Sequence, residues 1–77
     1  MKEEQRVSEA FSVPYFKENF QQYIERNKDV FTKTHAMNAY YRSIVGTLIN
    51  DNLNKNSEIV RRIRNLETAY IEIKNEN

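Results

Sequence analysis

The stretch VSEAFSVP, residues 7–14, decides how the fold begins, because its pattern suits a strand that leads into a helix. Small or polar side chains alternate with larger ones over residues 7–13, which is the two-residue period of a β-strand. Pro14 restrains Val13 to extended geometry and is itself suited to the first turn of a helix. We therefore expect a short strand over residues 7–13 and a helix from Pro14; a short helical turn over residues 3–11 is the alternative.

Outward from this stretch, apolar side chains recur at helical spacing in three segments. The first helix is predicted over residues 14–27, and the second over residues 33–51 with Thr32 or Thr34 as its cap. The third is predicted over residues 57–74. Its apolar side chains are spaced 4, 3, 4 and 3 apart, as in the seam of a coiled coil: Ile59, Ile63, Leu66, Tyr70 and Ile73.

An asparagine-rich stretch, NDNLNKN at residues 50–56, predicts a break between the second and third helices. Asn54 or Asn56 would then cap the third helix. The apolar seam also continues backwards through two asparagines without a change of phase. A single helix over residues 34–74 is therefore the alternative.

Length and composition limit the class of protein. A chain of 77 residues is one domain, and a core of that size supplies about 3–5 kcal/mol. The chain has no cysteine and one histidine, His35, so disulfides are excluded and no metal site is expected. Association with a second copy is the stabilising device that is left, and we expect a homodimer or a higher assembly.

The charge pattern and the hydropathy bear on location. The N-terminus carries charges of both signs, and no apolar run approaches the roughly 20 residues of a membrane span. We expect no signal peptide, no contact with a membrane and a cytoplasmic location. The net charge of +1 lacks the basic excess typical of nucleic-acid binding.

The residues that carry most enzymatic chemistry are missing from the sequence. A single glycine cannot form a phosphate-binding loop, and no Ser–His–acid pattern surrounds His35. Three arginines, Arg61, Arg62 and Arg64, are interpreted as solvated side chains that pair with acidic neighbours such as Glu58. We expect no enzyme, no catalytic residue and no cofactor.

A short strand, two helices and an appended third helix resemble the ribbon-helix-helix family of DNA-binding proteins. The resemblance covers residues 5–51 and rests on the alternating stretch before Pro14, the first helix, the turn ending in Thr32-Lys33-Thr34 and the more apolar second helix. It implies a mainly α fold with one short N-terminal strand, in which two chains pair their strands into a ribbon that enters the major groove. The domains would be a flexible arm (1–6), a DNA-binding domain (7–53) and a C-terminal helix (54–77).

The resemblance also implies roles for individual residues. The N-terminus of the second helix would hold a phosphate through Thr32, Lys33 and Thr34. The side chains expected to face the bases are Arg6, Ser8, Ala10 and Ser12. The shared dimer core would consist of Phe11, Val13, Phe16, Phe20, Met37, Tyr41, Ile44 and Leu48. The sequence departs from the family at Glu9, where an apolar residue is expected, and in its lack of basic side chains on the groove face.

These predictions lead to two alternative functions. The resemblance implies sequence-specific binding of double-stranded DNA by a homodimer, as a transcriptional repressor or a partition-type protein of plasmid or phage origin. The alternative is an all-α helical hairpin or coiled-coil dimer that binds proteins, as an adaptor, inhibitor or small scaffold, without binding nucleic acid. In either case the C-terminal helix is a candidate site for a protein partner.

Overall fold

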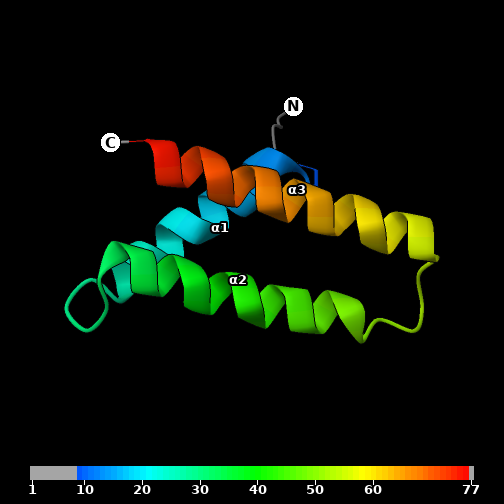
Figure 1. Cartoon of the computed structure of the whole chain (residues 1–77), viewed down its shortest axis with the longest axis horizontal. Helices are drawn as coiled ribbons and strands as arrows, with labels where there is room; N and C mark the ends of the chain where they lie inside the picture. Colours follow the sequence, from blue (N-terminus) through cyan, green and yellow to red (C-terminus); the bar gives the residue numbers. More distant parts are fainter. Residues whose placement is uncertain (1–8, 77) are drawn as a thin grey trace, which may run out of the picture.

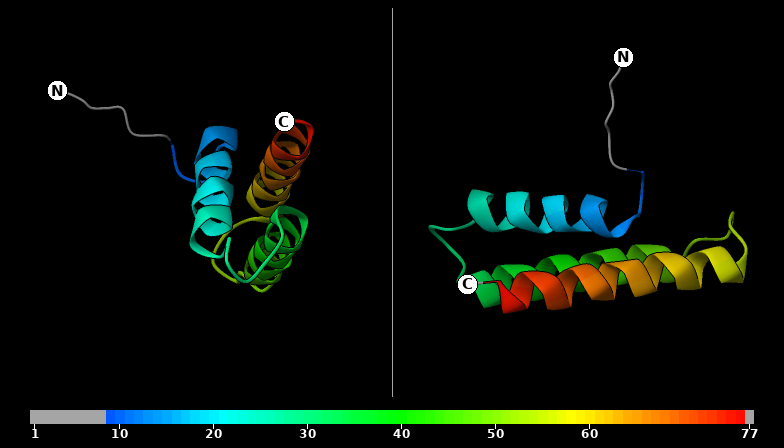
Figure 2. Two further views of the ribbon diagram at one scale, coloured as in Figure 1. Left: turned by 90° about the vertical axis from the view of Figure 1, so that its left-hand side faces the viewer. Right: turned by 90° about the horizontal axis from the view of Figure 1, so that it is seen from above.

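The computed structural model describes residues 9–76, and these residues form three α-helices with no strand among them. The helices are α1 (Val13–Arg26), α2 (Lys33–Ile49) and α3 (Asn56–Asn75). Each helix runs opposite to the one before it, so α1 and α3 run in the same direction (Figure 1). The α2 and α3 helices lie side by side, and the shorter α1 packs across one side of the pair (Figure 2). None of these helices is long and apolar enough to cross a bilayer.

The predicted strand is wrong, and with it the ribbon-helix-helix fold. The backbone folds into a turn in which the Ser12 amide donates to the Glu9 carbonyl at 3.1 Å. Phe11 has a φ of 65°, in the left-handed region that a strand excludes. Ser12 is the N-cap of α1, and its Oγ accepts a hydrogen bond from the Tyr15 amide at 3.3 Å. The all-helical alternative is therefore the one that the fold supports.

The three predicted helices are confirmed, as is the break before the third. The α2 helix ends at Ile49 and α3 begins at Asn56, so the single helix over residues 34–74 is wrong. The Asp51 carboxylate holds the connecting loop, accepting from the Leu53 amide at 2.7 Å and from the Asn54 side chain at 2.6 Å. The predicted asparagine cap is wrong, because Lys55 is the N-cap of α3 and makes no side-chain capping bond.

The core is small and draws on all three helices. Phe20 is 0% exposed, and its ring centroid lies 4.8 Å from that of Tyr40 on α2 and 6.0 Å from that of Tyr70 on α3. Tyr41 and Tyr70 meet at 5.4 Å and extend the aromatic contact between α2 and α3. The buried apolar residues are Phe16, Phe20, Ala36, Met37, Leu48, Leu66, Ala69 and Ile73.

Gly46 lies within α2 without a conformational reason to be glycine. It is the only glycine of the chain, and its φ is not positive. A Cβ built on it would meet nothing within 4 Å. Neither a close approach of backbones nor a left-handed conformation therefore requires glycine here.

We expect Gly46→Ala to raise the free energy of unfolding by about 0.5–1 kcal/mol, because alanine loses less backbone entropy on entering a helix. Urea unfolding followed by circular dichroism measures the change. A fall in stability would contradict the open surroundings of Gly46.

Candidate interaction surface

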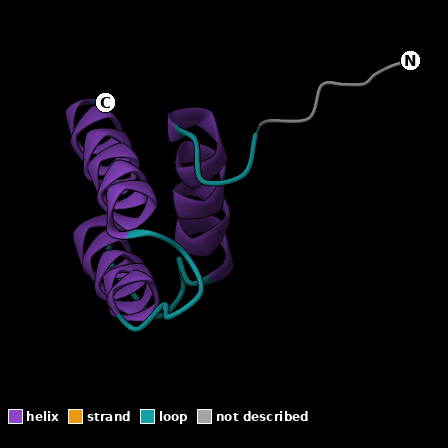
Figure 3. Cartoon of the chain, turned by 90° about the vertical axis from the view of Figure 1, so that its right-hand side faces the viewer, coloured by secondary structure: helices purple, strands orange, loops and turns teal. Residues whose placement is uncertain are grey.

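The side of α3 that is turned away from α1 carries a row of exposed side chains. The end-on views show α1 on one side of the α2–α3 pair and no helix on the other (Figures 2 and 3). Val60 is 47% exposed and Ile71 49% exposed, while Arg64 and Glu67 are also exposed. The spacing of 4, 3 and 4 positions places all four within about 60° of the helix circumference. We call Val60, Arg64, Glu67 and Ile71 the outer stripe of α3.

The two charges of the outer stripe form no ion pair within residues 9–76, whereas most other charges on α3 do: Glu58, Arg61, Arg62 and Glu72. Glu58 pairs with Arg61 at 2.8 Å and with Arg62 at 2.6 Å, as predicted for this cluster. Arg64 and Glu67 are three positions apart, but the structure places no ion pair between them. The basic residue precedes the acidic one, which is the less favourable order on a helix. Both charges are therefore available to a partner.

Further apolar side chains are exposed where α2 and α3 meet the loop between them. Ile49, at the end of α2, is 64% exposed, and Leu53 in the loop is 96% exposed. The hydrogen bonds to Asp51 order this loop, so Leu53 is presented to solvent by a defined turn. Ile49 and Leu53 thus add exposed apolar side chains at the end of the bundle that carries the α2–α3 loop.

A cluster around Arg62 holds that end of the molecule together. The Arg62 guanidinium lies 4.1 Å from the centroid of the Phe11 ring and donates from Nε to Glu58 Oε2 at 2.6 Å. It also lies 3.8 Å from Asp51 Oδ2. The Asn65 side chain donates to the Phe11 carbonyl at 3.0 Å. These contacts dock both the N-terminal turn and the α2–α3 loop onto α3.

The contacts of Glu58 in this cluster lower the pKa of its carboxyl group. Hydrogen bonds from Arg61 and Arg62 lower the pKa of Glu58 from 4.5 to about 2. A carboxylate whose pKa is lower in the folded state contributes stability that is fully present above the unfolded pKa. That contribution is lost as the pH falls from about 4.5 through about 2.

We expect the free energy of unfolding to decrease between pH 4.5 and pH 2, and Glu58→Gln to flatten this decrease, because the variant has no carboxylate to protonate. Urea unfolding at a series of pH values measures both profiles. Glu18→Gln is the matched control, since Glu18 is exposed on α1 and has no ion pair in the described part of the chain. A Glu58→Gln profile as steep as that of the parent would contradict the assignment.

The residues expected to face DNA bases do not form a common surface. Arg6 and Ser8 lie outside the described residues. Ala10 is exposed in the turn before α1, whereas Ser12 is half-buried and uses its hydroxyl to cap that helix. The structure therefore does not bring Ala10 and Ser12 onto the face of a ribbon.

The residues expected to hold a phosphate have partners within the chain or point to solvent. Thr32 caps α2, and its Oγ1 accepts from the His35 amide at 3.1 Å, which occupies a group that a phosphate would need. The Lys33 ammonium donates to the Glu76 carbonyl at 3.1 Å, near the end of α3. Thr34 is exposed. The start of α2 is thus tied to the C-terminal end of α3 (Figure 1).

The predicted dimer core and the predicted seam both lie within one chain. Phe16, Phe20, Met37 and Leu48 are buried, and Phe11, Val13, Tyr41 and Ile44 are half-buried against the core. In the seam, Leu66 and Ile73 are buried, while Ile59, Ile63 and Tyr70 are half-buried. The seam therefore faces the chain's own α1 and α2 along most of its length.

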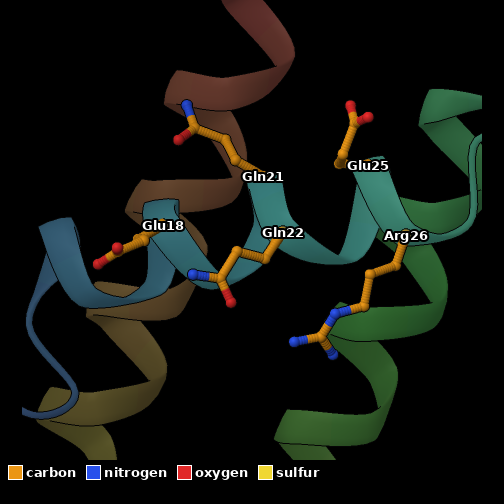
Figure 4. Close-up of a pocket in the computed structure, with 5 residues that line it drawn as sticks. All are labelled: Glu18, Gln21, Gln22, Glu25 and Arg26. Carbon is orange, nitrogen blue, oxygen red and sulfur yellow. The ribbon is translucent and has the colours of Figure 1, made fainter.

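Two hollows on the surface involve α1. One is lined by polar side chains that project from α1 alone: Glu18, Gln21, Gln22, Glu25 and Arg26 (Figure 4). The other lies between α1 and α2 and is lined in part by three tyrosines, Tyr15, Tyr23 and Tyr40. Burial raises the pKa of the Tyr40 hydroxyl. In the described residues no three acidic or histidine side chains are placed to hold a metal ion.

Residues 9–76 fold as a small three-helix bundle. The side of the α2–α3 pair away from α1 is not covered by a helix of this part of the chain (Figures 2 and 3). Residues 9–76, which are the residues the structure describes, match the family model described as YvfG protein, and the chain belongs to this family. It is 53% identical over 68 residues to a protein of Bacillus subtilis (strain 168) described as "Uncharacterized protein YvfG". The aligned region covers 88% of this chain and 93% of that relative. The three helices together are thus the unit that the family shares.

Sequence reasoning missed the outer stripe. Within the row, the two charged residues Arg64 and Glu67 lie between Val60 and Ile71, so the pattern does not predict an apolar face. The signal that could have found it is the second row of positions at 4, 3 and 4 spacing, on a different face of the helix from the buried seam.

Proposed function

We propose that this protein is a helical protein–protein interaction module, an adaptor, inhibitor or small scaffold, that binds through the uncovered side of α2 and α3. The observation that carries the proposal is the outer stripe of α3. Single exposed apolar residues are ordinary on protein surfaces. Here two of them flank two opposite charges without ion pairs on one row of a helix, which is the pattern of an anchored and oriented contact.

The small core supports the same conclusion. A domain of this size is only marginally stable by itself, and association with a partner adds stability by mass action. The buried residues stabilise the single chain, so they are not free to bind a partner. The partner must therefore contact exposed side chains, and Val60 and Ile71 of the outer stripe are large apolar side chains exposed on α3.

Sequence-specific DNA binding stays a prediction, but the β-ribbon on which it was based is absent from residues 9–76. The net charge of +1 gives no basic excess to attract a phosphate backbone. Of the three residues expected at the phosphate, Thr32 and Lys33 have partners within the chain. Protein binding is the function that the exposed residues support better.

We expect a photo-crosslinking residue, p-benzoylphenylalanine, to capture a protein when it replaces Ile71, because this side chain would lie inside the contact. The experiment is done in cells of the organism that encodes the protein, and the mass of the product identifies the partner. Gln21 on the outer face of α1 is the matched control, since it lies in the same bundle on an exposed polar surface. Equal capture from both positions, or none from Ile71, would contradict the proposal.

A further inference from the structure

We propose that the partner of the outer stripe is a second copy of this chain, with the two α3 helices antiparallel about a twofold axis that passes between Asn65 and Leu66. The inference rests on the proposed function and names its partner. It is carried by the order of the four residues in the stripe, which is complementary to itself when one helix is reversed.

The register follows from counting positions outward from the axis. Arg64 comes one position before Asn65, and Glu67 comes one position after Leu66. Val60 comes five positions before Asn65, and Ile71 comes five positions after Leu66. In an antiparallel pair, residues at equal distances on the two sides of the axis face each other.

Each stripe residue therefore meets a side chain of the matching kind on the other copy. Arg64 faces Glu67 of the other copy, and twofold symmetry produces this pair twice, as in any isologous interface. Val60 likewise faces Ile71 of the other copy at both ends of the stripe. The next exposed positions outward, Ser57 and Lys74, also face each other and bring no like charges together.

The alternative orientation is disfavoured by the same charges. If the two α3 helices were parallel and in register, Arg64 would face Arg64 and Glu67 would face Glu67. Like charges that face each other across an interface destabilise it. Because Arg64 and Glu67 form no ion pair within residues 9–76, the antiparallel pair satisfies both charges without breaking a contact that stabilises the single chain.

Charge reversal tests the pairing. The wild-type chain is expected to change from monomer to dimer between micromolar and millimolar concentration in sedimentation equilibrium. Arg64→Glu leaves two acidic groups facing each other, and Glu67→Arg leaves two basic groups. We expect each variant alone to dissociate at least about tenfold more readily than the wild type, because like charges replace both ion pairs.

An equal mixture of the two variants should restore the dimer, since every acidic group of one then faces a basic group of the other. The double variant Arg64→Glu/Glu67→Arg should also restore it. Circular dichroism of each variant checks that the fold is retained, as expected for exposed side chains that form no ion pair within residues 9–76. A wild type that stays monomeric at millimolar concentration, or a mixture no more dimeric than its components, would overturn the proposal.

Cysteine crosslinking tests the register, because the chain has no cysteine of its own. In the antiparallel dimer the two Val60 side chains are separated by 11 positions, or about 16 Å along the helix axis, which is beyond the reach of a disulfide. Val60→Cys and Ile71→Cys should therefore form a disulfide when mixed, whereas Val60→Cys alone should not. A disulfide formed by Val60→Cys alone would indicate a parallel pair and overturn the proposed geometry.

The outcomes separate this inference from the proposed function. If the wild type is monomeric but position 71 captures a different protein in cells, the proposed function stands and self-association is overturned. If position 71 captures nothing and the wild type is monomeric, both are overturned. If position 71 captures a second copy of the chain and the charge-reversed mixture associates, both are supported.

Discussion

Phe20 joins the three helices of this bundle, and the rest of the structure depends on its contacts. Its ring is 0% exposed and lies against Tyr40 from α2 and Tyr70 from α3. Removing a buried aromatic side chain of this kind costs about 3–5 kcal/mol, which is as much as a core of this size supplies. The contacts of Phe20 with Tyr40 and Tyr70 therefore fix which sides of α2 and α3 face the core. The opposite sides of these two helices then face solvent.

One short helix cannot cover both sides of a longer pair. Because α1 packs on one side through Phe16 and Phe20, the opposite side of α3 retains Val60 and Ile71 in solvent beside two charges that have no ion pair in the described chain. The Arg62 cluster keeps the N-terminal turn and the α2–α3 loop in place, so the uncovered side is held by ordered elements. A rigid helical surface of this kind binds with little loss of conformational entropy, which favours recognition by a partner.

Much of the helical structure could be predicted from the sequence, whereas its beginning and its exposed site could not. Apolar spacing located the three helices, and the asparagine-rich stretch marked where α2 ends. The cap of α2 was expected at Thr32 or Thr34, and the structure places it at Thr32. The alternation of side chains before Pro14 suggested a strand. In the structure the Ser12 hydroxyl caps α1 and Phe11 adopts a left-handed backbone conformation. A two-residue pattern of side chains reveals neither feature. The outer stripe was not predicted because charged residues on a helix are normally interpreted as solvated. Only the folded structure shows that Arg64 and Glu67 form no ion pair within residues 9–76.

The most direct measurement of the central claim is an isotope-filtered NOE experiment on a millimolar mixture of carbon-13-labelled and unlabelled chains. Such an experiment detects only contacts between different copies. The outer stripe account predicts intermolecular NOEs between the methyl groups of Val60 and those of Ile71. The absence of intermolecular NOEs, or NOEs that arise from the polar surface of α1, would contradict it.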